Sequence, residues 1–168
     1  GTVTVTLQGA TSISSGANGS NTLTLSGTQA DINATLATLN YQGDLNYTGA
    51  DTLTITSTDS NSASDVDTVA ITVTAQNDAP VNTVPGAQAV NENTLLNISG
   101  ISVNDVDGNL STVALAVTHG TLNVTLSGAA SISSGANGTN TLTLSGTQAD
   151  INATLASLSY QGDLNYTG

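Results

Sequence analysis

The sequence contains one long internal repeat, and this repeat limits the folds that the chain can adopt. Residues 1–49 recur as residues 120–168, an offset of 119 positions, and 42 of the 49 aligned pairs are identical. Most of the seven differences are conservative, such as Thr38 against Ser157. A period of 119 residues has the length of a whole domain, whereas a solenoid coil repeats every ~20–50 residues. The sequence therefore predicts parts of two tandem modules with the same fold.

A polar segment that ends in proline separates the two modules. Gln76–Pro80 follows the alternating stretch Thr68–Thr74 and has the composition of a linker. With a period of 119, we expect residues 1–75 to be the C-terminal part of one module, without its opening strands. Residues 76–80 are then the linker, and residues 81–168 are the N-terminal part of the next module, without its last two strands.

Apolar residues alternate with threonine along several stretches, which predicts strands with one aliphatic and one polar face. The alternating apolar positions are Val3, Val5, Leu7, Leu53, Ile55, Val69, Ile71, Val73, Val113, Leu115 and Val117. A turn at 16–19 separates Ile13 from Leu23. The pattern predicts an all-β fold of antiparallel β-sandwich modules in tandem.

One segment in each copy of the repeat departs from this alternation. Thr28–Asp31 resembles a helix capping box, and Ile32 and Leu36 follow at helical spacing. We therefore expect a short helix over residues 29–38 and another over its copy, 148–157. Each module should carry one such helix at the edge of its sandwich.

The composition excludes several classes of function. The chain has no Lys, no Arg and no Cys, and its 12 acidic residues give a net charge of -12. Binding to nucleic acid or to an anionic membrane surface needs basic side chains, so neither partner is expected. No apolar segment is long enough for membrane insertion. His119 is isolated, and no nucleophile motif accompanies the many serines, so we expect no enzyme.

Several motifs together resemble the bacterial cadherin-like repeats, of the VCBS type, that occur in large RTX-type cell-surface adhesins. The motifs are Asp51–Asp59, Asp67–Thr74 and Asn77–Val81 at the end of one module, followed by Val90–Thr94 and Val103–Gly108 in the next. The resemblance implies Ig-like or cadherin-like sandwiches that bind calcium and stack end to end. It also implies an extracellular location on a bacterial cell surface.

The resemblance assigns calcium ligands residue by residue, although the match is partial. The positions that correspond to ligands of the family are Asp59, Asn77, Asp78, Glu92, Asp105 and Asp107. Ala75 stands where the family has the first linker aspartate, and the family's Leu-Asp-Arg-Glu element is absent. The resemblance therefore implies fewer or weaker calcium sites than a full cadherin junction has.

The acidic residues themselves also suit calcium, which takes ~6–8 oxygen ligands. Asp105 and Asp107 are spaced to project to one side of a turn before Gly108. Asp65 and Asp67 repeat this spacing, in a predicted loop near Asp59. The further candidates, in or beside a loop that could face the module junction, are Asp44, Asp51 and Asp163. The alternative is that these aspartates are solvated residues that cap turns, as we expect of Asp31 and Asp150 at the helix starts.

Three functions are open at this point. The first is a calcium-rigidified spacer in an extracellular adhesin, whose partners are the neighbouring repeats of its own chain. The second is a structural subunit of an extracellular filament, sheath or surface layer, in which like chains pack laterally. The third, a carbohydrate-binding module, lacks the Trp or Phe platform on which sugars usually stack, because the chain has neither residue.

Overall fold

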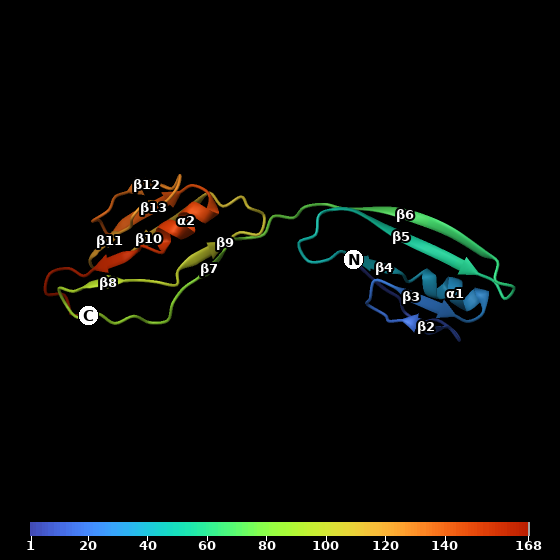
Figure 1. Ribbon diagram of the computed structural model, residues 1–168. Helices are drawn as coiled ribbons and strands as arrows, with labels where there is room; N and C mark the ends of the chain where they lie inside the picture. Colours follow the sequence, from blue (N-terminus) through green and yellow to red (C-terminus); the bar gives the residue numbers. More distant parts are fainter. Residues whose placement is uncertain (168) are drawn as a thin grey trace. The chain divides into compact units, whose positions relative to one another are not determined.

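The computed structural model describes residues 1–167, which form two compact units, residues 1–76 and residues 77–167 (Figure 1). We call them unit 1 and unit 2. Every strand pair in the described residues is antiparallel, and the two helices are short. The predicted all-β fold is therefore confirmed.

Unit 1 consists of three two-stranded sheets and one helix. Its elements are β1 (Thr2–Thr4), β2 (Ser12–Gly16), β3 (Leu23–Ser26), α1 (Gln29–Leu36), β4 (Asn40–Gln42), β5 (Gly49–Thr58) and β6 (Ser64–Val73). The pairs are β1 with β4, β2 with β3, and β5 with β6. Along β5, Leu53 and Ile55 are half-buried while the threonines between them are exposed, as the alternation predicts.

Unit 2 repeats the elements β1 to β4 and α1 of unit 1, and four strands precede them. Its elements are β7 (Val81–Thr83), β8 (Leu95–Asn97), β9 (Ser102–Asn104), β10 (Thr112–Ala116), β11 (Thr121–Asn123), β12 (Ser131–Gly135), β13 (Thr141–Ser145), α2 (Gln148–Leu155) and β14 (Ser159–Gln161). The sheets have the strand orders β10-β13-β12, β11-β14-β8 and β7-β9. One apolar core joins them, made of Val103, Leu122, Val124, Leu142, Leu144, Ile151, Leu155 and Leu158.

The predicted hairpin at residues 13–23 is confirmed as the pair β2–β3. Its turn begins at Gly16, whose φ of +73° favours glycine. A side chain is also excluded there by space, because a Cβ on Gly16 would meet the backbone oxygen of Thr22. The same geometry recurs at Gly135 in unit 2, so the turn belongs to the repeat.

The predicted helices are confirmed, although each ends two residues earlier than expected. Thr28 caps α1, because its side chain accepts a hydrogen bond of 3.2 Å from the backbone N–H of Asp31. The Thr28 hydroxyl also donates to the Asp31 carboxylate at 2.9 Å. Thr147 and Asp150 make the same contacts at the start of α2. Asp31 and Asp150 therefore have the capping role that the sequence predicts.

The strand expected along residues 3–7 is shorter than the alternation predicts, because a side chain takes the place of a neighbouring strand. Asn18 accepts a hydrogen bond of 2.8 Å from the Val5 N–H and donates one of 2.8 Å to the Val5 carbonyl. The backbone beyond Thr4 thus bonds to an amide side chain, and β1 ends. Asn137 makes the same two contacts with Val124 in unit 2.

The prediction that Asp65 and Asp67 lie in a loop is wrong. Both are in strand β6, where Asp65 pairs with Ser57 and Asp67 pairs with Ile55 of β5. The loop of this hairpin is only residues 59–63. Its first residue, Asp59, closes it by accepting backbone hydrogen bonds from Asn61 and Ala63, at 2.8 and 2.9 Å.

Neither helix in residues 1–167 has the length and apolar character needed to cross a membrane.

Replacing Leu144 by alanine should lower the free energy of unfolding of unit 2 by about 2–5 kcal/mol, because this fully buried side chain would leave a cavity. The matched substitution Leu25→Ala removes the same side chain at the same repeat position in unit 1. Leu25 is only half-buried, so unit 1 should lose less. Urea unfolding of the full chain, followed by NMR signals from each unit, measures both losses. Equal losses would contradict the difference in burial.

Candidate functional site

Asp105 is the most unusual acidic residue of the chain. It follows β9 and is only 4% exposed, although it carries a carboxylate. Its Oδ1 accepts a hydrogen bond of 3.0 Å from the Asp107 N–H, and its own N–H donates to Gln148 Oε1 at 2.7 Å. Its Oδ2 is buried and has no hydrogen-bond partner among the described residues. An unpartnered buried carboxylate oxygen is costly unless a cation or a donor meets it.

The linker residues lie against the same turn. Asp107 Oδ2 accepts a hydrogen bond of 2.6 Å from the backbone N–H of Asp78. Next to it, Asn109 donates from Nδ2 to Asn77 Oδ1 at 2.7 Å. The turn itself closes through the Gly108 N–H, which donates to the Asp105 carbonyl at 3.2 Å. We call these five residues, 77, 78, 105, 107 and 109, the Asp105 cluster; all of them belong to unit 2.

The Asp105 cluster gathers oxygen atoms without any basic side chain to balance them. Three of its members are aspartates and two are asparagines, and the chain contains no Lys or Arg. Across residues 1–167, no three His, Cys, Asp or Glu side chains stand close enough together to hold a metal ion. A cation here would therefore need amide and backbone carbonyl oxygens beside its carboxylates. Calcium accepts such mixed oxygen ligands.

The other predicted ligands have separate positions. Asp59 closes the β5–β6 loop, and Asp65 and Asp67 lie exposed along β6. Glu92 is exposed in a turn before β8, where its carbonyl accepts from the Thr94 hydroxyl at 3.3 Å. The structure thus brings together Asn77, Asp78, Asp105 and Asp107 from the predicted set.

Asp51 and Asp44 lie near the amino group of Gly1, at 3.3 and 3.4 Å. The Tyr41 hydroxyl donates a hydrogen bond of 2.7 Å to Asp51 Oδ2. This bond, aided by the Thr52 N–H, lowers the pKa of Asp51 below its usual value. The same bond is the main cause that raises the pKa of Tyr41 to about 12. Asp51 thus has hydrogen-bond donors within unit 1.

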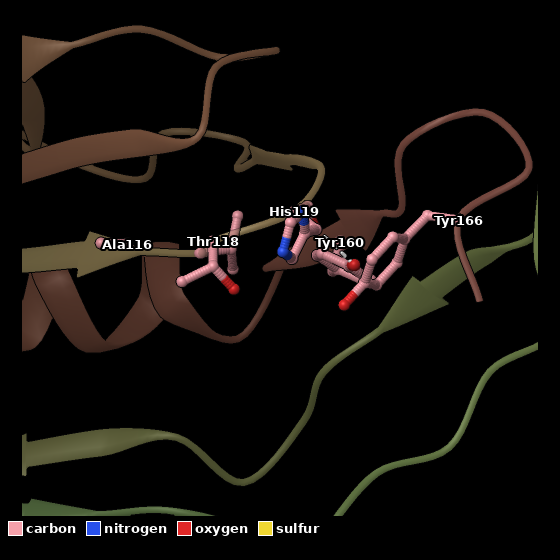
Figure 2. Close-up of a pocket in the computed structure, with 6 residues that line it drawn as sticks. Ala116, Thr118, His119, Tyr160 and Tyr166 are labelled. Atoms are coloured by element: carbon pink, nitrogen blue, oxygen red, sulfur yellow. Dashed lines mark hydrogen bonds between the residues drawn. The ribbon is translucent and has the colours of Figure 1, made fainter. Parts of the chain in front are cut away.

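His119 has neighbours that the sequence did not indicate. Its ring stacks on Tyr166 with a centroid distance of 4.2 Å, and its Nδ1 lies 3.8 Å from Asp163 Oδ2. Its carbonyl accepts from the Tyr160 hydroxyl at 2.5 Å. Figure 2 shows His119, Tyr160 and Tyr166 around a pocket of about 360 Å³ that Thr118 also lines. No motif in the sequence indicates these contacts, because they join His119 to residues more than 40 positions further along the chain.

A family model matches the N-terminal part of the chain. It is described as the Protein GAMETE EXPRESSED 2 domain, or GEX2, and it matches residues 2–78. These 77 residues are nearly the whole of unit 1 and fewer than half of the 168 residues. Neither a curated protein nor a solved structure matches the chain.

This match overturns the resemblance to bacterial cadherin-like repeats, since the GEX2 domain is a different family. The prediction of a calcium-rigidified adhesin spacer is therefore wrong, and the alternative of a filament, sheath or surface-layer subunit is unsupported. The physical reason is that the resemblance used short strands and acidic turns that have local roles. Asp59 closes a hairpin loop, for example, and Asp67 lies within a strand. Any antiparallel sheet rich in Thr, Asn and Asp offers such motifs.

Tyr41 should ionise with a pKa of about 12 because the Asp51 carboxylate opposes a second negative charge beside it. The hydrogen bond between Tyr41 and Asp51 should stabilise the folded chain fully at pH values between 3.8 and 10.0, the usual pKa values of aspartate and tyrosine. It should be lost as the pH falls through the lowered pKa of Asp51 or rises through about 12. Phenolate absorbance during an alkaline titration measures the pKa of Tyr41. Asp51→Asn should bring the pKa of Tyr41 back toward 10.0, and an unchanged titration would refute the contact.

Proposed function

We propose that this chain is a non-catalytic, calcium-binding β-protein that works outside the cell. The single observation that carries the proposal is the buried Asp105 Oδ2, which has no partner among the described residues. A calcium ion at the Asp105 cluster would supply the positive charge that the composition denies this carboxylate. The ion would act on the fold of unit 2, by holding the linker residues 77 and 78 on the turn at 105–108.

The donor types of the Asp105 cluster support calcium in particular. Carboxylates, amide oxygens and backbone carbonyls are hard oxygen ligands, whereas zinc prefers Cys and His side chains. The chain has no Cys, and its single His is His119, outside the cluster. Asp105 and Asp107 would provide the charge, Asn77 would provide an amide oxygen, and backbone carbonyls would complete the ligand set.

The same ligand set supports a location outside the cell. Sites with few carboxylates bind calcium weakly, and extracellular modules commonly work with dissociation constants of about 10⁻⁴–10⁻³ M. Such a site fills only where calcium is abundant. The printed name of the matched domain associates it with a gamete-expressed protein. We therefore propose that residues 2–78 form a domain of this kind within an extracellular protein.

The pocket beside His119 supports a structural role more than a catalytic one. The imidazole stacks on Tyr166, and its Nδ1 is 3.8 Å from Asp163, too far for a hydrogen bond. The Tyr160 hydroxyl donates to a backbone carbonyl and so positions the chain at the β10–β11 connection. These contacts hold the connection in place, and Asp163 is too far from the imidazole to orient it as a general base.

Calcium should raise the melting temperature of unit 2 above its value in excess chelator, because an ion that binds only the folded state stabilises it by mass action. At a calcium concentration 100-fold above the dissociation constant, the stabilisation would be about 2.7 kcal/mol. Thermal melts of the full chain with and without calcium test this, and titration calorimetry gives the affinity. Identical melts in both buffers would refute the proposal.

Asp105→Asn should abolish the calcium response without lowering the calcium-free stability, because it removes a buried charge and keeps an oxygen that can accept from the Asp107 N–H. The matched control is Asp65→Asn, which removes one charge from the exposed side of β6 and should leave the response intact. Loss of the response in both variants would show a general charge effect. A full response in Asp105→Asn would place the ion elsewhere.

A further inference from the structure

The two copies of the repeat have the same sequence over their apolar face but differ in how deeply it is buried. In unit 2, Leu142, Leu144, Ile151 and Leu155 are at most 1% exposed. In unit 1 the corresponding Leu23, Leu25 and Ile32 are only half-buried, and Leu36 is 37% exposed. Residues 21–37 and 140–156 are identical, so the sequence of the face cannot cause the difference. Something covers this face in unit 2 that unit 1 does not contain.

The cover in unit 2 is residues 95–118, which precede the repeat and include β8, β9 and β10. We call them the covering segment. Val103 is part of the core and is 3% exposed. Six further apolar side chains of the segment pack against that core: Ile98, Ile101, Leu110, Val113, Leu115 and Val117. Unit 1 begins at β1, the counterpart of β11, and has no element that corresponds to this segment.

The covering segment also completes two sheets. In unit 2, β10 pairs along the edge of β13, and β8 pairs along the edge of β14. The corresponding strands of unit 1 are β3, which pairs only with β2, and β4, which pairs only with β1. Unit 1 therefore presents two open strand edges where unit 2 has paired ones. Open edges are ready to accept a further strand.

Two polar side chains of helix α2 also bind the covering segment. In unit 2, Asn152 exchanges two hydrogen bonds of 2.9 Å with the backbone of Val103 in the covering segment. Gln148 accepts from the Asp105 N–H at 2.7 Å. The counterparts of these side chains in unit 1 are Asn33 and Gln29, which are exposed and make no side-chain hydrogen bond within residues 1–167. Asn33 and Gln29 are therefore placed to bind a strand that corresponds to β9.

We propose that the open face of unit 1, made by β3, β4 and α1, is a docking surface for a segment with the sequence of residues 95–118. The apolar face, the two strand edges and the helix amides all fit that segment, as their near-identical copies in unit 2 show. The occupant is a segment that would join Gly1 directly, as the covering segment joins Gly120 in unit 2. In unit 2 the covering segment runs through His119 into Gly120, the counterpart of Gly1, without any intervening linker. The docking uses the apolar face, the strand edges and the helix amides, and the proposal does not depend on the function proposed above.

Hydrogen exchange on the unmodified chain gives the first test. Because residues 21–37 and 140–156 are identical, their unprotected amides exchange at the same intrinsic rates. Any difference between the copies therefore reports structure alone, and NMR separates their signals. We expect amides of β3 and α1 to exchange at least about tenfold faster than those of β13 and α2. Equal rates would overturn the proposal, because unit 1 would then be complete without a cover.

The second test adds a copy of residues 81–119 directly before Gly1 of the full chain. The added copy should slow exchange in β3 and α1 to within about threefold of β13 and α2. Unchanged exchange in β3 and α1 would overturn the proposal and would show that residues 2–78 form a whole domain by themselves. The signals of unit 2 confirm in the same spectrum that the extended chain is folded.

A matched control extension separates docking from unspecific stabilisation. It carries Val103→Asn and Leu115→Asn in the added copy only, which removes two apolar side chains that face the core while leaving the length and charge unchanged. The control should protect β3 and α1 at least about tenfold less than the intact extension. Equal protection by both extensions would overturn the proposal, since the side chains of the segment would then have no part in the effect.

Discussion

The structure depends on burying a small number of aliphatic side chains. The chain has no Phe, Trp or Met, so its cores must be built from Leu, Ile and Val, each of which contributes about 1.5–3 kcal/mol when buried. Unit 2 reaches full burial of Leu144 and Ile151 only because the sheets, the helix and the covering segment all contribute to one core. Unit 1, with the same repeat sequence and no such segment, leaves that face half-buried.

Local signals in the sequence were sufficient for several elements of the fold. The hairpin turn at Gly16 and the capping residues Thr28 and Asp31 act within a few residues, so their sequence patterns determine their structure. The alternation along β5 likewise predicts which face is buried. The turn and the helix cap are the same in the two units, which shows that they do not depend on the surroundings.

Features that depend on distant contacts could not be predicted in this way. The alternation predicted a strand along residues 3–7, but Asn18 bonds to the backbone of Val5 and ends β1. The spacing of Asp65 and Asp67 suggested a metal-binding loop, whereas the register of β5 with β6 makes them strand residues. In the candidate site, the pair Asp105 and Asp107 was predictable from its spacing. The burial of Asp105 was not, because it depends on packing around α2 and β9.

The order of elements along unit 2 has a consequence for folding during protein synthesis. The covering segment lies N-terminal to the repeat copy that it covers, and a ribosome therefore releases residues 95–118 before residues 120–168. When β13 and α2 emerge, the strands that pair with them and shield their leucines are already present. The reverse order would leave an apolar face and two strand edges exposed on the nascent chain, where neighbouring copies of so similar a repeat could pair wrongly.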